Sequence, residues 1–264
     1  MAIVRRVRNP WKRSMMALRA ARGTVFVLRH GSTERNRGGV GQDQIRGHAD
    51  IPMTPGGEAE VRVTAWQIGA VRIERIWSSD LQRAARTAEI VSDENPGYPP
   101  MELTAALRSW DMGPSMEGKV TTPDVIEQIE DWVENDTVVP PGGESFRAYC
   151  TRVIAAARPV FERAVEYGET LGIVAHGRVV QVIDFWVAAG CDEDCMHVEF
   201  ADYLADEPDT VPPGGGVQFK NDGLGWLGVV IGSGVPSVGT QVAAGTYVRP
   251  ANKLAEDQDG VPAS

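Results

Sequence analysis

Residues 25–31 read VFVLRHG, an apolar and largely β-branched run that ends abruptly in a cation, an imidazole and a glycine. A run without polar alternation is typical of a strand that is buried on both faces of a sheet. Residues 171–177 read LGIVAHG and repeat the pattern, so a second buried strand also ends in His-Gly. Because ligands bind beyond the carboxyl ends of parallel strands, we expect His30 and His176 at one edge of the sheet.

The rest of the chain alternates short apolar runs with segments of helical spacing. This alternation indicates an α/β fold, a three-layer sandwich in which helices flank a mostly parallel central sheet. Ser79 or Asp80 is expected to cap the second helix. The expected strands cover residues 24–28, 75–79, 101–103 and 171–175, and the expected helices cover residues 55–70, 80–92, 123–134, 144–167 and 179–189.

The pattern changes beyond residue 208. Two apolar runs, 217–219 and 226–231, are separated by Asn-Asp-Gly, which predicts a β-hairpin at an edge of the sheet. We therefore expect a single domain over residues 23–231, a basic and flexible arm over 1–22, and a low-complexity tail over 232–264. The hairpin edge could pair with a second copy, which leaves a homodimer open.

The 264-residue chain has a formal net charge of -10, although residues 1–22 hold seven basic side chains and no acidic one. An acidic body does not suit binding to nucleic acid or to anionic lipid. No apolar run is long enough to span a bilayer, and no signal-peptide pattern is present. Three cysteines cannot all pair, so we expect a cytoplasmic protein. The basic arm could be a nucleic-acid or targeting segment, a frayed tail or an overextended start.

Residues 77–88 read WSSDLQRAARTA, where a third expected strand ends and a helix begins. Arg83 would lie in the first turn of this helix. A helix N-terminus attracts an oxyanion through its peptide N–H groups and its dipole. With Arg29 and the two imidazoles, Arg83 would form a cationic pocket in an acidic protein. Phosphate is the expected ligand, because guanidinium groups match its oxygens in bidentate fashion.

Five blocks follow one another between residues 24 and 190: VLRHGSTERN, IRGHADIPMTPGGEAE, WSSDLQRAARTAE, PPGGESFRAYCTR and LGIVAHGRVVQVI. Together they resemble the histidine phosphatase superfamily, which includes cofactor-dependent phosphoglycerate mutases and many broad phosphatases. The resemblance implies a phosphomonoesterase that works through a phosphohistidine on a small phosphorylated substrate. It implies no metal and no other cofactor.

The resemblance also implies a role for each matching residue. His30 would be the nucleophile, while Arg29, Arg83 and His176 would surround the phosphate oxygens. Asn36 and Gly177 would add contacts to the phosphate. Gly31 would let the backbone approach it closely.

One position departs from the family pattern. Ser109 stands where family members usually carry the glutamate that protonates the leaving oxygen. Asp111 is the nearest carboxyl and is our candidate general acid, with loop orientation or pairing to an arginine as the alternative. The segment resembles a subfamily, frequent among phage-encoded and related bacterial sequences, with Leu-Arg-x-Trp-Asp-x-Gly here. Trp110 is expected in the pocket wall.

Two alternative functions stay open. One is a phosphotransferase of the mutase kind, and the other is a phospho-ligand binding or scaffold protein with a weakened catalytic acid. Residues 191–197, CDEDCMH, are interpreted as an acidic loop rather than a metal site, because no second Cys or His pair accompanies them. The motifs do not specify the substrate.

Overall fold

The computed structural model describes residues 23–36, 41–191, 211–223 and 225–232. Within them six strands form one sheet in the order β3-β2-β4-β1-β5-β6. The first four strands pair in parallel, whereas β5 and β6 form an antiparallel hairpin at one edge. The expected mixed sheet and edge hairpin are confirmed. The strands are β1 (Thr24–Arg29), β2 (Arg75–Ser79), β3 (Met101–Thr104), β4 (Thr170–Ala175), β5 (Gly216–Asn221) and β6 (Trp226–Ile231).

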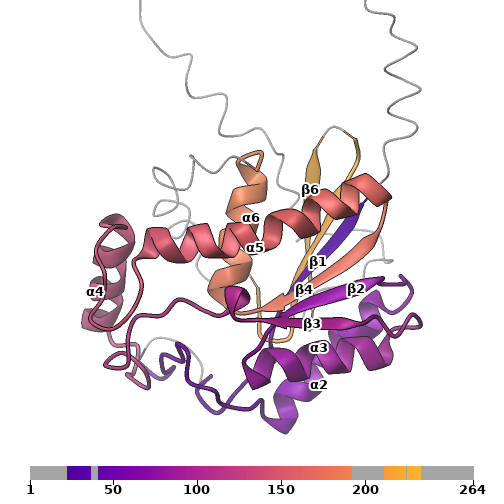
Figure 1. Cartoon of the computed structure of the whole chain (residues 1–264). Coiled ribbons are helices and arrows are strands. Elements are labelled where there is room, and N and C mark those ends of the chain that lie inside the picture. Colours follow the sequence, from indigo (N-terminus) through magenta and orange to yellow (C-terminus); the bar gives the residue numbers. More distant parts are fainter. Residues whose placement is uncertain (1–22, 37–40, 192–210, 224, 233–264) are drawn as a thin grey trace, which may run out of the picture.

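Helices cover both faces of this sheet. In Figure 1, α2 and α3 lie together on one face, α5 and α6 lie on the other, and α4 lies to one side. The three-layer sandwich is therefore confirmed. The helices are α2 (Pro55–Ile68), α3 (Gln82–Glu94), α4 (Pro123–Glu134), α5 (Phe146–Tyr167) and α6 (Gly177–Ala188).

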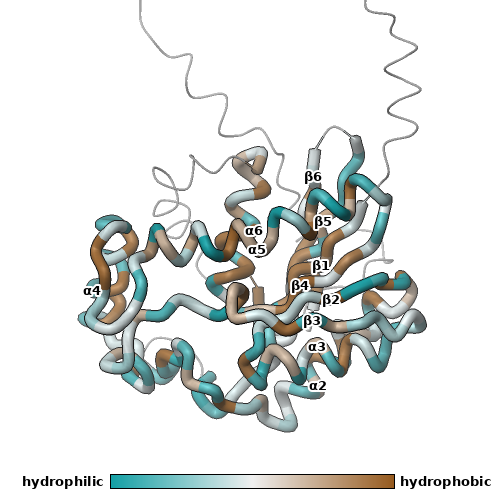
Figure 2. Tube along the Cα trace, in the orientation of Figure 1, coloured by the Kyte–Doolittle hydropathy of each residue, from teal (hydrophilic) through white to brown (hydrophobic). Residues whose placement is uncertain are grey.

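The central strand β1 is buried on both faces. Val25 and Val27 contribute to the core under α5 and α6, whereas Phe26 and Leu28 contribute to the core under α2 and α3. Figure 2 shows the matching band of apolar residues along β1 and β4. A strand that packs against helices on both sides needs no polar alternation, which is why it is continuously apolar in sequence.

The start of α3 differs from the prediction. The helix begins at Gln82 rather than residue 80, and neither Ser79 nor Asp80 caps it with its side chain. The carboxylate of Asp80 accepts two hydrogen bonds from Arg108, at 2.7 and 2.6 Å. Asp50, from a preceding loop, accepts a hydrogen bond from the N–H of Gln82 at 2.7 Å instead. A tertiary contact therefore replaces the expected local cap.

Several predicted segments lie outside the described residues. These are the basic arm 1–22, nearly all of the tail 232–264, and residues 192–197 of the acidic loop. In the part of the chain that the structure does describe, no helix is long and apolar enough to cross a membrane.

Candidate active site

His30 and His176 follow the ends of the neighbouring parallel strands β1 and β4, whose last residues pair in register. The two imidazole rings meet edge to face, with centroids 5.2 Å apart and an interplanar angle of 66°. Both side chains are almost completely buried. As expected from the repeated His-Gly pattern, one edge of the sheet brings the two rings together.

The hydrogen bonding of His30 fixes its tautomer. Its Nδ1 lies 2.7 Å from the carbonyl oxygen of Gly31. A carbonyl can only accept, so Nδ1 carries the hydrogen and Nε2 is left with a lone pair in the neutral ring. Burial holds the pKa of His30 well below its ordinary value, and the charges of Arg83 and Arg46 lower it further. The ring is therefore neutral at neutral pH, with a free lone pair on Nε2.

His176 is held by a serine. Its Nε2 lies 3.0 Å from Oγ of Ser79, while Nδ1 is buried and has no hydrogen-bond partner among the described residues. Burial, followed by the charge of Arg83, keeps the pKa of His176 well below its ordinary value. If the Ser79 hydroxyl donates to Nε2, the hydrogen on Nδ1 is available to a ligand oxygen. From the sequence we expected Ser79 only as a possible cap of the second helix.

Arg83 is a buried cation. Its Nη1 donates to the carbonyl of Ala49 at 2.6 Å and its Nη2 to that of Gly47 at 3.1 Å, while Nε has no partner among the described residues. Burial lowers the pKa of Arg83 to about 10, so it stays charged at neutral pH. The N–H of Gln82 is already bonded to Asp50. This peptide group is therefore not available to an anion, and the guanidinium supplies the positive charge.

Arg29 lies against the start of α6. Its Nη1 donates to the carbonyl of Val211 at 2.8 Å. A Cβ atom at Gly177 would come within 3.2 Å of the Arg29 guanidinium, so glycine there makes room for the cation. The N–H of Gly214 donates to the carbonyl of His30 at 3.0 Å. The segment before the C-terminal hairpin therefore supports both residues of the Arg-His pair, which no local sequence signal indicated.

Gly31 is required by packing, and the close approach of its backbone to a phosphate stays a prediction. A Cβ atom at this position would lie 2.1 Å from the carbonyl oxygen of Gly57, in the first turn of α2. Close packing of the β1 end against α2 therefore excludes a side chain. Asn36 lies in the same loop, and its Oδ1 accepts from the N–H and hydroxyl of Thr33, both at 3.0 Å. Its contact with a phosphate stays a prediction.

Residues 25–192 match the family model described as histidine phosphatase superfamily, branch 1. The chain belongs to the histidine phosphatase superfamily. A 2,3-bisphosphoglycerate-dependent phosphoglycerate mutase from Cytophaga hutchinsonii is 28% identical over 181 residues, which cover 67% of this chain and 83% of that protein. A protein of Citrobacter koseri named "Probable phosphoglycerate mutase GpmB" is 32% identical over 172 residues, 63% of this chain and 71% of that protein.

Solved structures agree with this assignment at the level of the fold. A mycobacterial glucosyl-3-phosphoglycerate phosphatase superposes with a TM-score of 0.58 at 20% identity, over 78% of this chain and 96% of that one. A Bacillus anthracis phosphoglycerate mutase superposes with a TM-score of 0.58 at 18% identity, over 78% and 91%. The neighbours of this superfamily member thus include both phosphatases and mutases.

Two residues of the pocket region were given no individual role from the sequence. The charge of Arg46 contributes to the lowered pKa of both His30 and His176. His48 lies two residues further along the same loop and also acts on His176. Both stand in the block IRGHADIP, which carries part of the resemblance to the superfamily. Their side chains, a cation and an imidazole, were the only signal in the sequence that they could belong to the pocket, because the loop reaches the pocket through a tertiary contact with Arg83.

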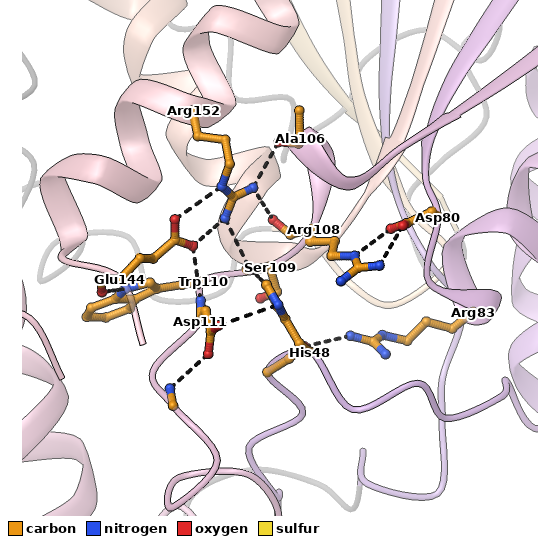
Figure 3. Close-up of polar contacts among 12 residues, drawn as sticks. His48, Asp80, Arg83, Ala106, Arg108, Ser109, Trp110, Asp111, Glu144 and Arg152 are labelled. Atoms are coloured by element: carbon orange, nitrogen blue, oxygen red, sulfur yellow. Dashed lines mark hydrogen bonds and ion pairs between the residues drawn. The ribbon is translucent and has the colours of Figure 1, made fainter. Parts of the chain in front are cut away.

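The segment that departs from the superfamily pattern lies beside this loop (Figure 3). The carbonyl of Ser109 is 2.8 Å from Nε2 of His48. One carboxylate oxygen of Asp111 accepts from the N–H of Gly113 at 2.9 Å, and the other is 3.6 Å from Nδ1 of His48. Asp111 is about one-third exposed and His48 about one-quarter exposed, so both side chains reach solvent.

Arg152 of α5 holds this segment in place. Its guanidinium donates to the carbonyls of Ala106, Arg108 and Ser109, at 2.9, 3.1 and 3.3 Å, and forms an ion pair with Glu144. The carboxylate of Glu144 in turn accepts from the N–H of Asp111 at 3.2 Å. These contacts fix the backbone on both sides of position 109.

Trp110 does not line a pocket. It is only 2% exposed, packs against Phe146 and Tyr149, and donates from Nε1 to the carbonyl of Glu144 at 2.9 Å. The prediction of a pocket-wall residue is wrong, because the indole turns into the core while its neighbour Asp111 faces His48. Trp110 instead anchors the segment.

Proposed function

We propose that this protein is a metal-independent phosphomonoesterase that acts on a small phosphorylated substrate through a phosphohistidine at His30. The observation that carries the proposal is the state of His30. It is buried and neutral, its hydrogen is held on Nδ1 by the carbonyl of Gly31, and the ring lies in the electrostatic field of the Arg83 cation. A neutral imidazole with a free lone pair is a competent nucleophile toward phosphorus.

The first half of the reaction transfers the phosphoryl group to the protein. Nε2 of His30 forms a bond to phosphorus while the bond between phosphorus and the leaving oxygen breaks. Arg29, Arg83 and His176 stabilise the charge on the three equatorial oxygens, as preorganised donors do in a water-poor site. Asn36 and the start of α6 at Gly177 add polar contacts around the group.

The leaving oxygen needs a proton unless it is a weakly basic phenolate. Asp111 supplies it in this proposal, since Ser109 has no acidic side chain. The carboxyl is held by Gly113 and His48 on a segment that Arg152 braces, and it is partly open to solvent. In the second half, water attacks phosphorus, the bond to Nε2 breaks, and the proton of the water returns to the acid.

A mutase is the second candidate, and the similarity to a phosphoglycerate mutase over 83% of that relative favours it. The chemistry at His30 would be the same. The difference lies in the acceptor, which would be a second alcohol of a bound substrate rather than water.

Release of inorganic phosphate and transfer to an alcohol separate the two candidates. We would incubate the protein with a phosphate monoester in the presence of a second alcohol, such as glycerol, and measure both products. Hydrolysis predicts that phosphate is the main product, whereas a mutase transfers the group to the alcohol or within the substrate. The matched control is His30→Asn, which keeps a polar side chain but removes the nucleophile. Phosphate release that survives in this variant would contradict the proposed function.

A further inference from the structure

We infer that His48 supplies the proton that Asp111 delivers to the leaving oxygen, so that the two side chains act as a proton-donating pair. The inference rests on the proposed function, because the pair serves the same reaction. It assigns a role to a histidine outside the phosphate-binding set and explains how a chain with Ser109 in place of the usual glutamate can protonate a leaving group.

The backbone places His48 between the phosphate pocket and the segment of Asp111. The carbonyls immediately before and after it, those of Gly47 and Ala49, both accept hydrogen bonds from the buried guanidinium of Arg83. The loop at His48 is thus clamped to a phosphate-pocket residue, while the ring extends to Ser109 and Asp111 (Figure 3). His48 is the physical link between the two halves of the site.

The hydrogen bonds of the ring identify the proton that can move. Nε2 faces the carbonyl of Ser109, which only accepts, so Nε2 keeps its hydrogen in either charge state. The exchangeable proton is therefore the one at Nδ1, which faces the carboxylate of Asp111 at 3.6 Å. An imidazolium beside a carboxylate and an imidazole beside a carboxylic acid differ only in the position of this one proton.

A pair of this kind suits the reaction better than a lone carboxyl. An imidazole beside the carboxyl provides a second group that can carry the proton to the leaving oxygen. The charged groups around the ring act in opposite directions. Asp111 and Asp80 are negative, the guanidinium groups of Arg83 and Arg152 contact its loop and the Ser109 carbonyl, and the neutral ring of His176 also interacts with it.

The proton transfers balance over the two halves of the reaction. As the bond from phosphorus to the leaving oxygen breaks, the Nδ1 proton of His48 passes to Asp111 and from Asp111 to that oxygen. The products are a neutral alcohol, a neutral His48, an ionised Asp111 and phosphorylated His30. When water attacks phosphorus, one proton of the water passes through Asp111 back to Nδ1 of His48, and the starting state is restored.

The test compares leaving groups in wild-type protein and in H48Q. Glutamine can still donate to the Ser109 carbonyl but has no titratable proton. We would measure kcat/KM for p-nitrophenyl phosphate, whose leaving group needs no proton, and for glycerol phosphate, whose leaving group does. The ratio of glycerol phosphate to p-nitrophenyl phosphate is expected to fall by about 100-fold, the ordinary contribution of a general acid. Asp93→Asn, an exposed carboxyl on α3, is the control and should keep the wild-type ratio.

The pH profile supplies a readout that a purely structural role would not change. Turnover of glycerol phosphate needs the protonated pair, so it falls as pH rises through the pH at which the pair loses its proton. In H48Q only the carboxyl remains, and the descending limb should move to lower pH. His48→Asn is measured in the same way if H48Q does not fold.

The outcomes are distinct. A fallen ratio with an acid-shifted limb supports the pair. A wild-type ratio in folded H48Q or H48N overturns the inference while leaving the proposed function intact. Absence of any phosphohistidine in the wild-type protein overturns the proposed function, and the inference with it.

Discussion

The imidazole rings of His30 and His176 meet edge to face with centroids 5.2 Å apart, at the ends of two strands that pair in parallel. Both rings are buried next to the charge of Arg83, and both have pKa values well below the ordinary range because burial disfavours the charged form. Neutral rings can act as nucleophile and hydrogen-bond donor, but the same burial makes the fold sensitive to acid.

The first prediction is a loss of stability as pH falls. The unfolded chain protonates its histidines near pH 6.5, whereas folded His30 and His176 bind protons only at lower pH, so the unfolded state binds more protons in that window. At pH 5.5 we expect the free energy of unfolding to be lower than above pH 7.5 by on the order of 1 kcal/mol per histidine. Urea denaturation at a series of pH values measures this, and His30→Asn should lose about half of the difference. An equally steep dependence in that variant would contradict the assignment.

The second prediction concerns the planar guanidinium group of Arg83. Lysine carries the charge but cannot bridge the carbonyls of Gly47 and Ala49 and also face a phosphate. Arg83→Lys should lower kcat/KM by about 10²- to 10³-fold, the usual cost of losing a transition-state donor. It should also weaken the binding of vanadate, measured by protection against thermal unfolding. Arg86→Lys, on the same helix with exposed ion pairs to Glu58 and Glu89, is the matched control and should change little.

The third prediction concerns the orientation of His176. Ser79→Ala removes the hydroxyl 3.0 Å from Nε2 and so releases the ring from its fixed hydrogen-bonding state. We expect kcat to fall by about 10-fold, less than the cost of deleting an oxyanion donor. Ser78→Ala is the control, because that hydroxyl bonds only to the Ser79 carbonyl in the described structure. Equal effects of the two changes would remove Ser79 from this role.

The fourth prediction concerns the bracing of Asp111. Arg152→Gln leaves the carbonyls of Ala106, Arg108 and Ser109 without their shared donor, which should destabilise the fold by about 1–3 kcal/mol. Turnover of glycerol phosphate should fall more than turnover of p-nitrophenyl phosphate, because the segment that carries the acid loses its support. Arg147→Gln, also on α5, breaks a more exposed ion pair with Asp136 of the preceding link and serves as control. A uniform loss with both substrates would indicate a structural role alone.

The sequence predicted the parts of the site that follow from local pattern. The runs before His30 and His176 are continuously apolar, so they indicated two buried parallel strands that deliver both rings to one edge. The helix predicted after β2 also placed Arg83 correctly, in the first helical turn. The predictions for the cap of α3 and the position of Trp110 were wrong, because Asp50 and the aromatic core reach these places from distant parts of the chain. The packing of Gly31 against Gly57 was not predicted for the same reason.

His48 and Arg46 were missed for a related physical reason. Their loop has no periodic pattern, and it reaches the pocket only because Arg83 donates to the carbonyls of Gly47 and Ala49. Every residue has a backbone carbonyl, so the residue type at the accepting position does not reveal such a contact. The support of Arg29 by the Val211 carbonyl belongs to the same class.

The most direct test of the central claim is detection of phosphate on His30. The protein would be mixed with p-nitrophenyl phosphate, stopped with alkali within the first turnovers, digested, and analysed by mass spectrometry for an alkali-stable, acid-labile phosphoryl group. A phosphohistidine intermediate predicts the label on the peptide that contains His30, in amounts approaching the enzyme concentration when its hydrolysis is slow, and no label in His30→Asn. Steady release of phosphate without any label on His30, or with the same label in the variant, would contradict it.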